Sequence, residues 1–119
     1  MDREQLLDAF VNSMPDPVVI TGLDHRIIYM NREAINLFEG GADLIGSSLF
    51  DCHKEEKSNQ VIREVFERLQ NGEEEVQITD RSGRREGYFQ HTYMRAIRDS
   101  EGKLVAYYER YKYWPGRID

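Results

Sequence analysis

The sequence contains few of the residues that cross-link or stiffen small proteins. Cys52 is the only cysteine among 119 residues, and there are three prolines and one tryptophan. A single cysteine excludes an internal disulfide. Because small secreted domains usually depend on disulfides, we expect a reducing, cytoplasmic setting, which a cytoplasmic domain of a membrane-anchored protein would also satisfy.

Long apolar runs and basic patches are missing as well. No stretch approaches the roughly 20 apolar residues needed to cross a membrane, and no secretory signal opens the sequence. The formal net charge is -6, with acidic and basic residues mixed along the chain. An acidic chain of this kind argues against a nucleic-acid partner, and the missing apolar runs argue against a membrane. The length and the 39% share of hydrophobic residues suit one domain with a single core.

The clearest local signal lies near the N-terminus. Two short runs, at residues 18–20 and 27–30, are rich in the β-branched and aromatic side chains that suit strands. Gly22 and Asp24 lie between these runs and tolerate a tight reversal, which predicts a β-hairpin. Asn31 offers a side-chain cap for a helix that follows.

Apolar residues recur at helical spacing in three places. They predict a helix over about residues 3–13, a short helix around 34–38 that ends at Gly40-Gly41, and a longer helix from about residue 54 to Asn71-Gly72. Residues 42–45 fit one further turn. The stripe of the first helix either packs on its own domain or pairs with a second copy, and it consists of Leu6, Leu7, Phe10, Val11 and Met14.

The last third reads as strands. Strands are predicted over residues 76–78, 88–97 and 104–113, with turns at 80–83 and 99–102, and Trp114-Pro115-Gly116 is expected to break the final strand. This order predicts an α+β fold with a five-stranded antiparallel sheet and helices on one face. The expected division is an N-terminal helix over 1–14, one domain over 15–113 and a tail over 114–119.

Four short motifs resemble landmarks of the PAS domain family. Their order and spacing across residues 6–112 carry the resemblance, and they are Met14-Pro15-Asp16-Pro17-Val18, Tyr29-Met30-Asn31, Ile45-Gly46-Ser47-Ser48-Leu49-Phe50-Asp51 and Arg98-Asp99-Ser100-Glu101-Gly102-Lys103. Membership of this family implies a signal-sensing or partner-binding module. It does not identify the signal.

The resemblance also sets the phase of the long strands. Aligning on Arg98-Asp99 implies that the inward side chains are Gln90, Thr92, Met94 and Ala96, together with Val76, Ile78, Val105, Tyr107, Glu109 and Tyr111. A shift of the last strand by one residue would instead turn Ala106, Tyr108 and Arg110 inward. An inward Glu109 would need a partner, because an unpaired buried charge is costly. Outward aromatic residues would form an exposed patch that suits a partner, and these are Phe89, Tyr93 and Tyr108.

A mixed apolar and polar inner wall predicts a pocket for a small, largely apolar ligand. The alternative is a filled core in which Gln90 and Thr92 bond to each other or to backbone. An anionic ligand is disfavoured, because the assumed phase places no Arg or Lys inward. The predicted lining is Ile35, Phe38, Val65, Phe66, Ile78, Gln90, Thr92, Met94, Tyr107 and Glu109.

Cofactor-bearing PAS groups are not matched. Leu49 stands where flavin photosensors have their reactive cysteine, and Ile78 where they have a flavin-binding asparagine. The chromophore cysteine of the yellow photoreceptor lies further along than Cys52. We expect no cofactor and no metal site, although His53 could serve as a haem ligand.

These observations predict a non-enzymatic sensory PAS module of a signalling system. We expect a homodimer through Leu6, Leu7, Phe10 and Val11, and an effector such as a kinase or regulator domain. A ligand-free docking module is the first alternative. A small enzyme on an α+β scaffold is the second, and the sequence shows no convergent acid, base or nucleophile set for it.

Overall fold

The residues that the structure describes form one sheet and three α-helices. The computed structural model describes residues 1–52, 56–80 and 87–115. The elements are α1 (Arg3–Asn12), β1 (Val18–Gly22), β2 (Ile27–Met30), α2 (Arg32–Leu37), the 3-10 turns η1 (Gly41–Leu44) and η2 (Leu49–Cys52), α3 (Glu56–Gln70), β3 (Glu75–Asp80), β4 (Tyr88–Arg98) and β5 (Leu104–Pro115). The predicted α+β class is confirmed, with element ends shifted by a few residues.

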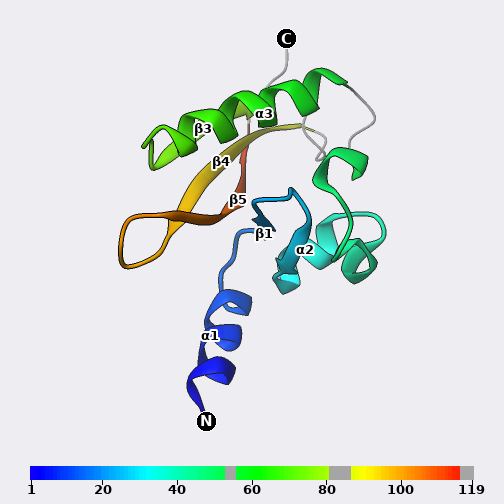
Figure 1. Ribbon diagram of the computed structural model, residues 1–119. Coiled ribbons are helices and arrows are strands. Elements are labelled where there is room, and N and C mark those ends of the chain that lie inside the picture. The colour runs from blue at the N-terminus through cyan, green and yellow to red at the C-terminus, as the bar shows by residue number, and fades with distance from the viewer. Residues whose placement is uncertain (53–55, 81–86, 116–119) are drawn as a thin grey trace.

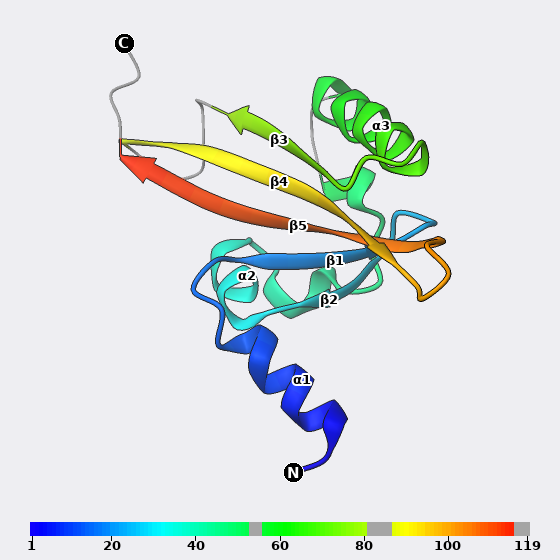
Figure 2. The ribbon, with the colours of Figure 1, turned by 90° about the vertical axis from the view of Figure 1, so that its left-hand side faces the viewer.

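The five strands form one antiparallel sheet in the order β2-β1-β5-β4-β3. The last strand in sequence therefore lies at the centre, beside the first (Figure 2). The predicted five-stranded antiparallel sheet is thus confirmed. Because β5 pairs with both β1 and β4, the β1–β2 and β3–β4 pairs belong to one continuous sheet and share its inner face.

The β1–β2 hairpin closes through local hydrogen bonds. The backbone N–H of His25 donates to the Gly22 carbonyl at 2.9 Å, and the Asp24 carboxylate accepts from the Arg26 N–H at 3.1 Å. His25 takes a φ of +65°, a left-handed conformation that histidine adopts more readily than most residues. This turn points the His25 side chain back towards the body of the domain.

Two expectations for β5 were wrong. The strand continues through Trp114 to Pro115, which pairs with Tyr88 at the end of the ladder, where a proline is tolerated. Val105 does not face inward. The register jumps from the Ile97–Ala106 pair to the Arg98–Leu104 pair, so Val105 is the extra residue of a β-bulge and is 43% exposed.

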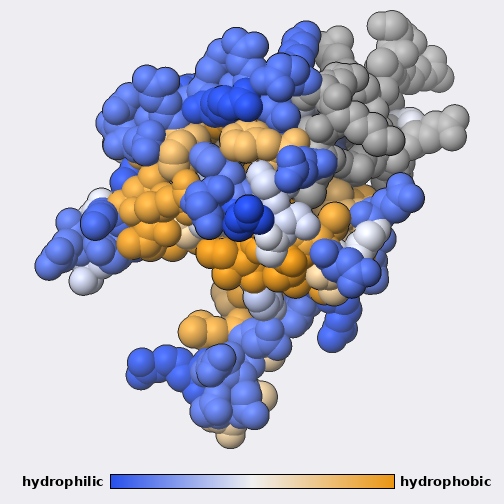
Figure 3. Space-filling view, turned by 45° about the vertical axis from the view of Figure 1, so that its right-hand side comes forward, coloured by the Kyte–Doolittle hydropathy of each residue, from blue (hydrophilic) through white to orange (hydrophobic). Residues whose placement is uncertain are grey.

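The core lies between the inner sheet face, α2 and α3. Ala34 of α2 and Leu69 of α3 have no exposed surface, and Met94 and Tyr107 are equally buried on the sheet. Hydrophobic side chains gather in a band between the charged surfaces of α3 and α1 (Figure 3). The one-sided pattern of α3 is therefore explained by packing on its own domain.

Helix α1 behaves differently, because it projects away from the domain (Figure 1). It contains no buried residue, and Leu6, Leu7 and Phe10 are 57%, 56% and 60% exposed. Its apolar stripe therefore has no partner within the core. Within the described residues, no helix has the length and apolar character needed to cross a bilayer.

Candidate functional site

The inner face of β4 and β5 has the predicted phase. Gln90, Thr92, Met94 and Ala96 are all buried, at 7%, 8%, 0% and 8% exposure. They lie opposite Tyr113, Tyr111, Glu109 and Tyr107 of β5, in that order. The alternative phase of β5, with Arg110 inside, is excluded because Glu109 is 3% exposed.

Polar groups run along this face. The Gln90 amide donates to the Thr92 hydroxyl at 2.9 Å, and the Tyr111 hydroxyl donates to the Glu109 carboxylate at 2.5 Å. Glu109 thus has the partner that its burial requires. The Gln90 Oε1 atom is buried and has no hydrogen-bond partner in the part of the chain that the structure describes. A buried acceptor of this kind can take a ligand donor.

A histidine that the sequence did not single out closes one end of the face. His25 Nδ1 lies 2.9 Å from the Tyr107 hydroxyl. The imidazole packs against the rings of Phe50 and Phe66, with centroids 4.7 and 4.6 Å away. The hairpin turn, η2, α3 and β5 therefore meet at this side chain. The only sequence signal was a histidine directly after Asp24 in a tight turn.

Burial sets the protonation of this pair. Desolvation lowers the pKa of His25, partly offset by the Asp24 carboxylate and reinforced by the Arg63 guanidinium. Desolvation also raises the pKa of Tyr107, with the Glu109 carboxylate adding to the effect. A neutral imidazole beside a protonated phenol results, so the Tyr107 hydroxyl can donate to Nδ1.

The opposite wall comes from α2 and α3. Val65 is buried, and Ile35, Phe38 and Phe66 are half-buried against the core. The Phe38 and Tyr111 rings meet edge to face at 5.3 Å. Ile78 packs on the same core from β3. The structure thus gathers all ten predicted lining residues around one face, and their role in binding a ligand stays a prediction.

Few of the described residues could bind a flavin, a metal ion or haem. Leu49 is buried at 4% exposure, and an aliphatic side chain there cannot form a bond to flavin. Among the described residues, no three His, Cys, Asp or Glu side chains converge on a metal site. His53 and the side chain of Cys52 lie outside the described residues.

The outer face carries less exposed aromatic surface than predicted. Tyr93 is half-buried, with the Arg110 guanidinium 4.4 Å from its ring centroid. Arg110 also pairs with Asp16 at 3.0 Å. Tyr108 is half-buried too, and the side chain of Phe89 lies outside the described residues. Arg110 therefore covers part of the predicted aromatic patch.

The antiparallel sheet with helices packed on its inner face defines an α+β class of domain. The sequence model described as "PAS domain" matches residues 15–109. This chain belongs to the PAS domain family. No curated protein sequence matches it.

Solved structures share the fold at low sequence identity. A C-terminal domain from Streptococcus mutans is 23% identical with a TM-score of 0.74, covering 92% of this chain and 83% of that one. The PAS domain of BvgS from Bordetella pertussis is 14% identical with a TM-score of 0.77, covering 98% and 90%. VqmA from Vibrio cholera, solved with ligand and DNA, is 16% identical with a TM-score of 0.70, covering 95% and 51%.

Proposed function

We propose that this domain is a sensory module that binds a small, largely apolar ligand between the inner sheet face and α3. The main support is the buried Gln90 Oε1 atom, which has no hydrogen-bond partner among the described residues. A ligand N–H or O–H would satisfy it. VqmA, which has a similar fold, was solved with a ligand.

Native mass spectrometry of the purified protein tests this proposal. An added mass that disappears on denaturation is expected, and Gln90→Leu should remove it. Gln77→Leu is the matched control, because Gln77 is exposed on the neighbouring strand. If no molecule co-purifies and no small apolar compound shifts the NMR signals of Thr92 and Met94, the ligand role is wrong.

The exposed stripe of α1 favours a second candidate function, a dimerisation or docking module that works without a ligand. Leu6 and Phe10 lie one turn apart and are 57% and 60% exposed. We propose that two copies of the chain, or this chain and a kinase or regulator domain, associate through the α1 stripe. The stripe residues in this contact are Leu6, Leu7, Phe10 and Val11. The module itself is proposed to have no catalytic role.

Sedimentation tests the dimer. The protein with Leu7→Asp and Phe10→Asp should remain folded and sediment as a monomer, because both side chains lie outside the core. The unaltered protein should sediment as a dimer. A monomer at high concentration before any substitution would refute this function and leave the ligand proposal intact.

A further inference from the structure

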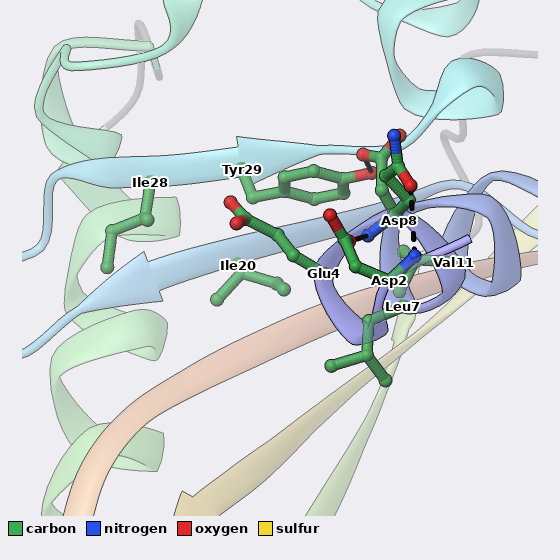
Figure 4. A pocket seen from close by; sticks show the side chains of 9 residues that line it. Asp2, Glu4, Leu7, Asp8, Val11, Ile20, Ile28 and Tyr29 are labelled. Carbon is green, nitrogen blue, oxygen red and sulfur yellow. Dashed lines mark hydrogen bonds between the residues drawn. The ribbon is translucent and has the colours of Figure 1, made fainter.

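A groove of about 540 Å³ lies between α1 and the outer side of the first hairpin, away from the inner face (Figure 4). Ile20 and Tyr29 are paired neighbours on β1 and β2, so both point to this side. Ile28 joins them because the register shift makes it the extra residue of a bulge. The lining is Asp2, Glu4, Gln5, Leu7, Asp8, Val11, Ile20, Ile28 and Tyr29.

The floor and one wall of this groove are apolar and open to water. Ile28 is 58% exposed on the strand side, and Leu7 is 56% exposed on the helix side. Figure 4 shows Ile20 and Ile28 on neighbouring strands with α1 alongside. Covering these side chains with another apolar surface would be favourable, at a scale of about 25 cal/mol per Å².

The rim of the groove is acidic. Asp2, Glu4 and Asp8 line it, and no Lys or Arg is among the lining residues. The Asp2 carboxylate caps α1 by accepting from the Gln5 N–H at 2.8 Å, and Asp8 accepts from the Tyr29 hydroxyl at 2.7 Å. None of these three acids forms an ion pair within the described residues. The rim therefore carries uncompensated negative charge.

We propose that this groove docks an amphipathic helix of a partner protein, with an apolar stripe flanked by Lys or Arg. The apolar stripe matches Leu7, Ile20 and Ile28, and the cations match the acidic rim. A second copy of α1 would bring the same three carboxylates against this rim, so charge disfavours it as the occupant. The proposal does not depend on a ligand at the inner face.

Fluorescence anisotropy with two synthetic helical peptides tests the proposal. One has leucines at i, i+3, i+4 and i+7 with flanking lysines, and the other has glutamates in place of the lysines. The basic peptide should bind at least about tenfold more tightly, and added salt should weaken it. Equal binding of the two peptides would overturn the proposal.

Variants locate the binding site. Ile28→Asp should weaken binding of the basic peptide at least about tenfold, because it places a charge in the apolar floor. Glu4→Lys lies on the exposed surface of α1 and should weaken binding of this peptide about two- to fivefold without disturbing the fold. Phe10→Asp is the matched control, because Phe10 is 60% exposed on α1 and does not line the groove.

Two results would contradict the assignment. Unchanged peptide binding in both Ile28→Asp and Glu4→Lys would place the peptide elsewhere. If sedimentation shows self-association that Ile28→Asp abolishes and Phe10→Asp does not, a second copy occupies the groove. If Ile28→Asp does not fold, the effect of Glu4→Lys on binding of the basic peptide tests the site by itself.

Discussion

At the scale of single residues, Asn31 connects more of the chain than any sequence pattern suggested. Its Oδ1 atom accepts from the backbone N–H groups of Val18 and Ala34, at 2.9 and 3.0 Å. Its Nδ2 atom donates to the carbonyls of Val11 and Asp16, at 3.1 and 3.0 Å. The predicted helix cap is therefore also the joint between α1, β1 and α2.

Replacing Asn31 with alanine should lower the free energy of unfolding by about 2–4 kcal/mol, because buried backbone groups lose their partners. Urea denaturation followed by circular dichroism measures this. Asn12→Ala is the matched control, since Asn12 accepts a hydrogen bond from the exposed Arg32 N–H, and it should cost about 0.5–1.5 kcal/mol. Equal losses in the two variants would contradict the joint role.

His25 should make stability depend on pH. Its pKa in the folded state is lowered from 6.5, mainly by burial. The unfolded chain therefore binds this proton more readily, so the neutral imidazole contributes stability that is complete above pH 6.5 and is lost as the pH falls towards the folded pKa.

Unfolding measured at several pH values between about 7.5 and 5 checks this dependence. In the unaltered protein, the free energy of unfolding should fall as the pH drops below 6.5, the ordinary pKa of histidine. His25→Phe should remove the part of this fall that comes from His25. A slope that is the same in both proteins would show that His25 does not titrate in this range.

At the scale of elements, α1 depends on polar contacts at its base. No α1 residue is buried, and the Tyr29 hydroxyl reaches Asp8 from β2 at 2.7 Å. Burial and the Asp8 carboxylate raise the pKa of Tyr29 to about 12, so the hydroxyl remains a donor at neutral pH. The position of α1, and with it the groove, therefore depends on a few hydrogen bonds.

Tyr29→Phe combined with Asn12→Ala should loosen α1 while leaving the sheet intact. Hydrogen exchange should become several-fold faster in Arg3–Asn12, because each lost bond is worth about 0.5–1.5 kcal/mol. Exchange in β4 and β5 should not change. Faster exchange throughout the domain would mean that these contacts stabilise the core instead.

The elements themselves could be predicted because their signals are local. Alternation in β4, glycine after α3 and the Asn31 cap each act within a few residues. The bulge at Val105 could not be predicted, because an extra residue leaves the apolar pattern of a strand unchanged. The ring contacts of His25 could not be predicted either, because the neighbouring rings come from η2, α3 and β5, which are distant in the sequence.

At the scale of the whole molecule, periodicity did not show what each stripe contacts. The stripes of α1 and α3 look alike in sequence, yet Leu69 is fully buried and Phe10 is 60% exposed. A helical stripe specifies an apolar surface and leaves its partner open. The inner wall could be located because the family resemblance fixed the strand phase, and the groove at α1 could not.

The purified protein should be colourless, with no visible absorption band from flavin or haem. The family resemblance places Leu49 and Ile78 where flavin photosensors have a cysteine and an asparagine, and these aliphatic side chains supply neither a thiol nor an amide. The described helix α3 contains no histidine for haem. Absorption spectra before and after addition of haem check this. A band that appears with haem and is lost in His53→Ala would identify His53 as the axial ligand, whereas a band that survives this change would place the ligand elsewhere.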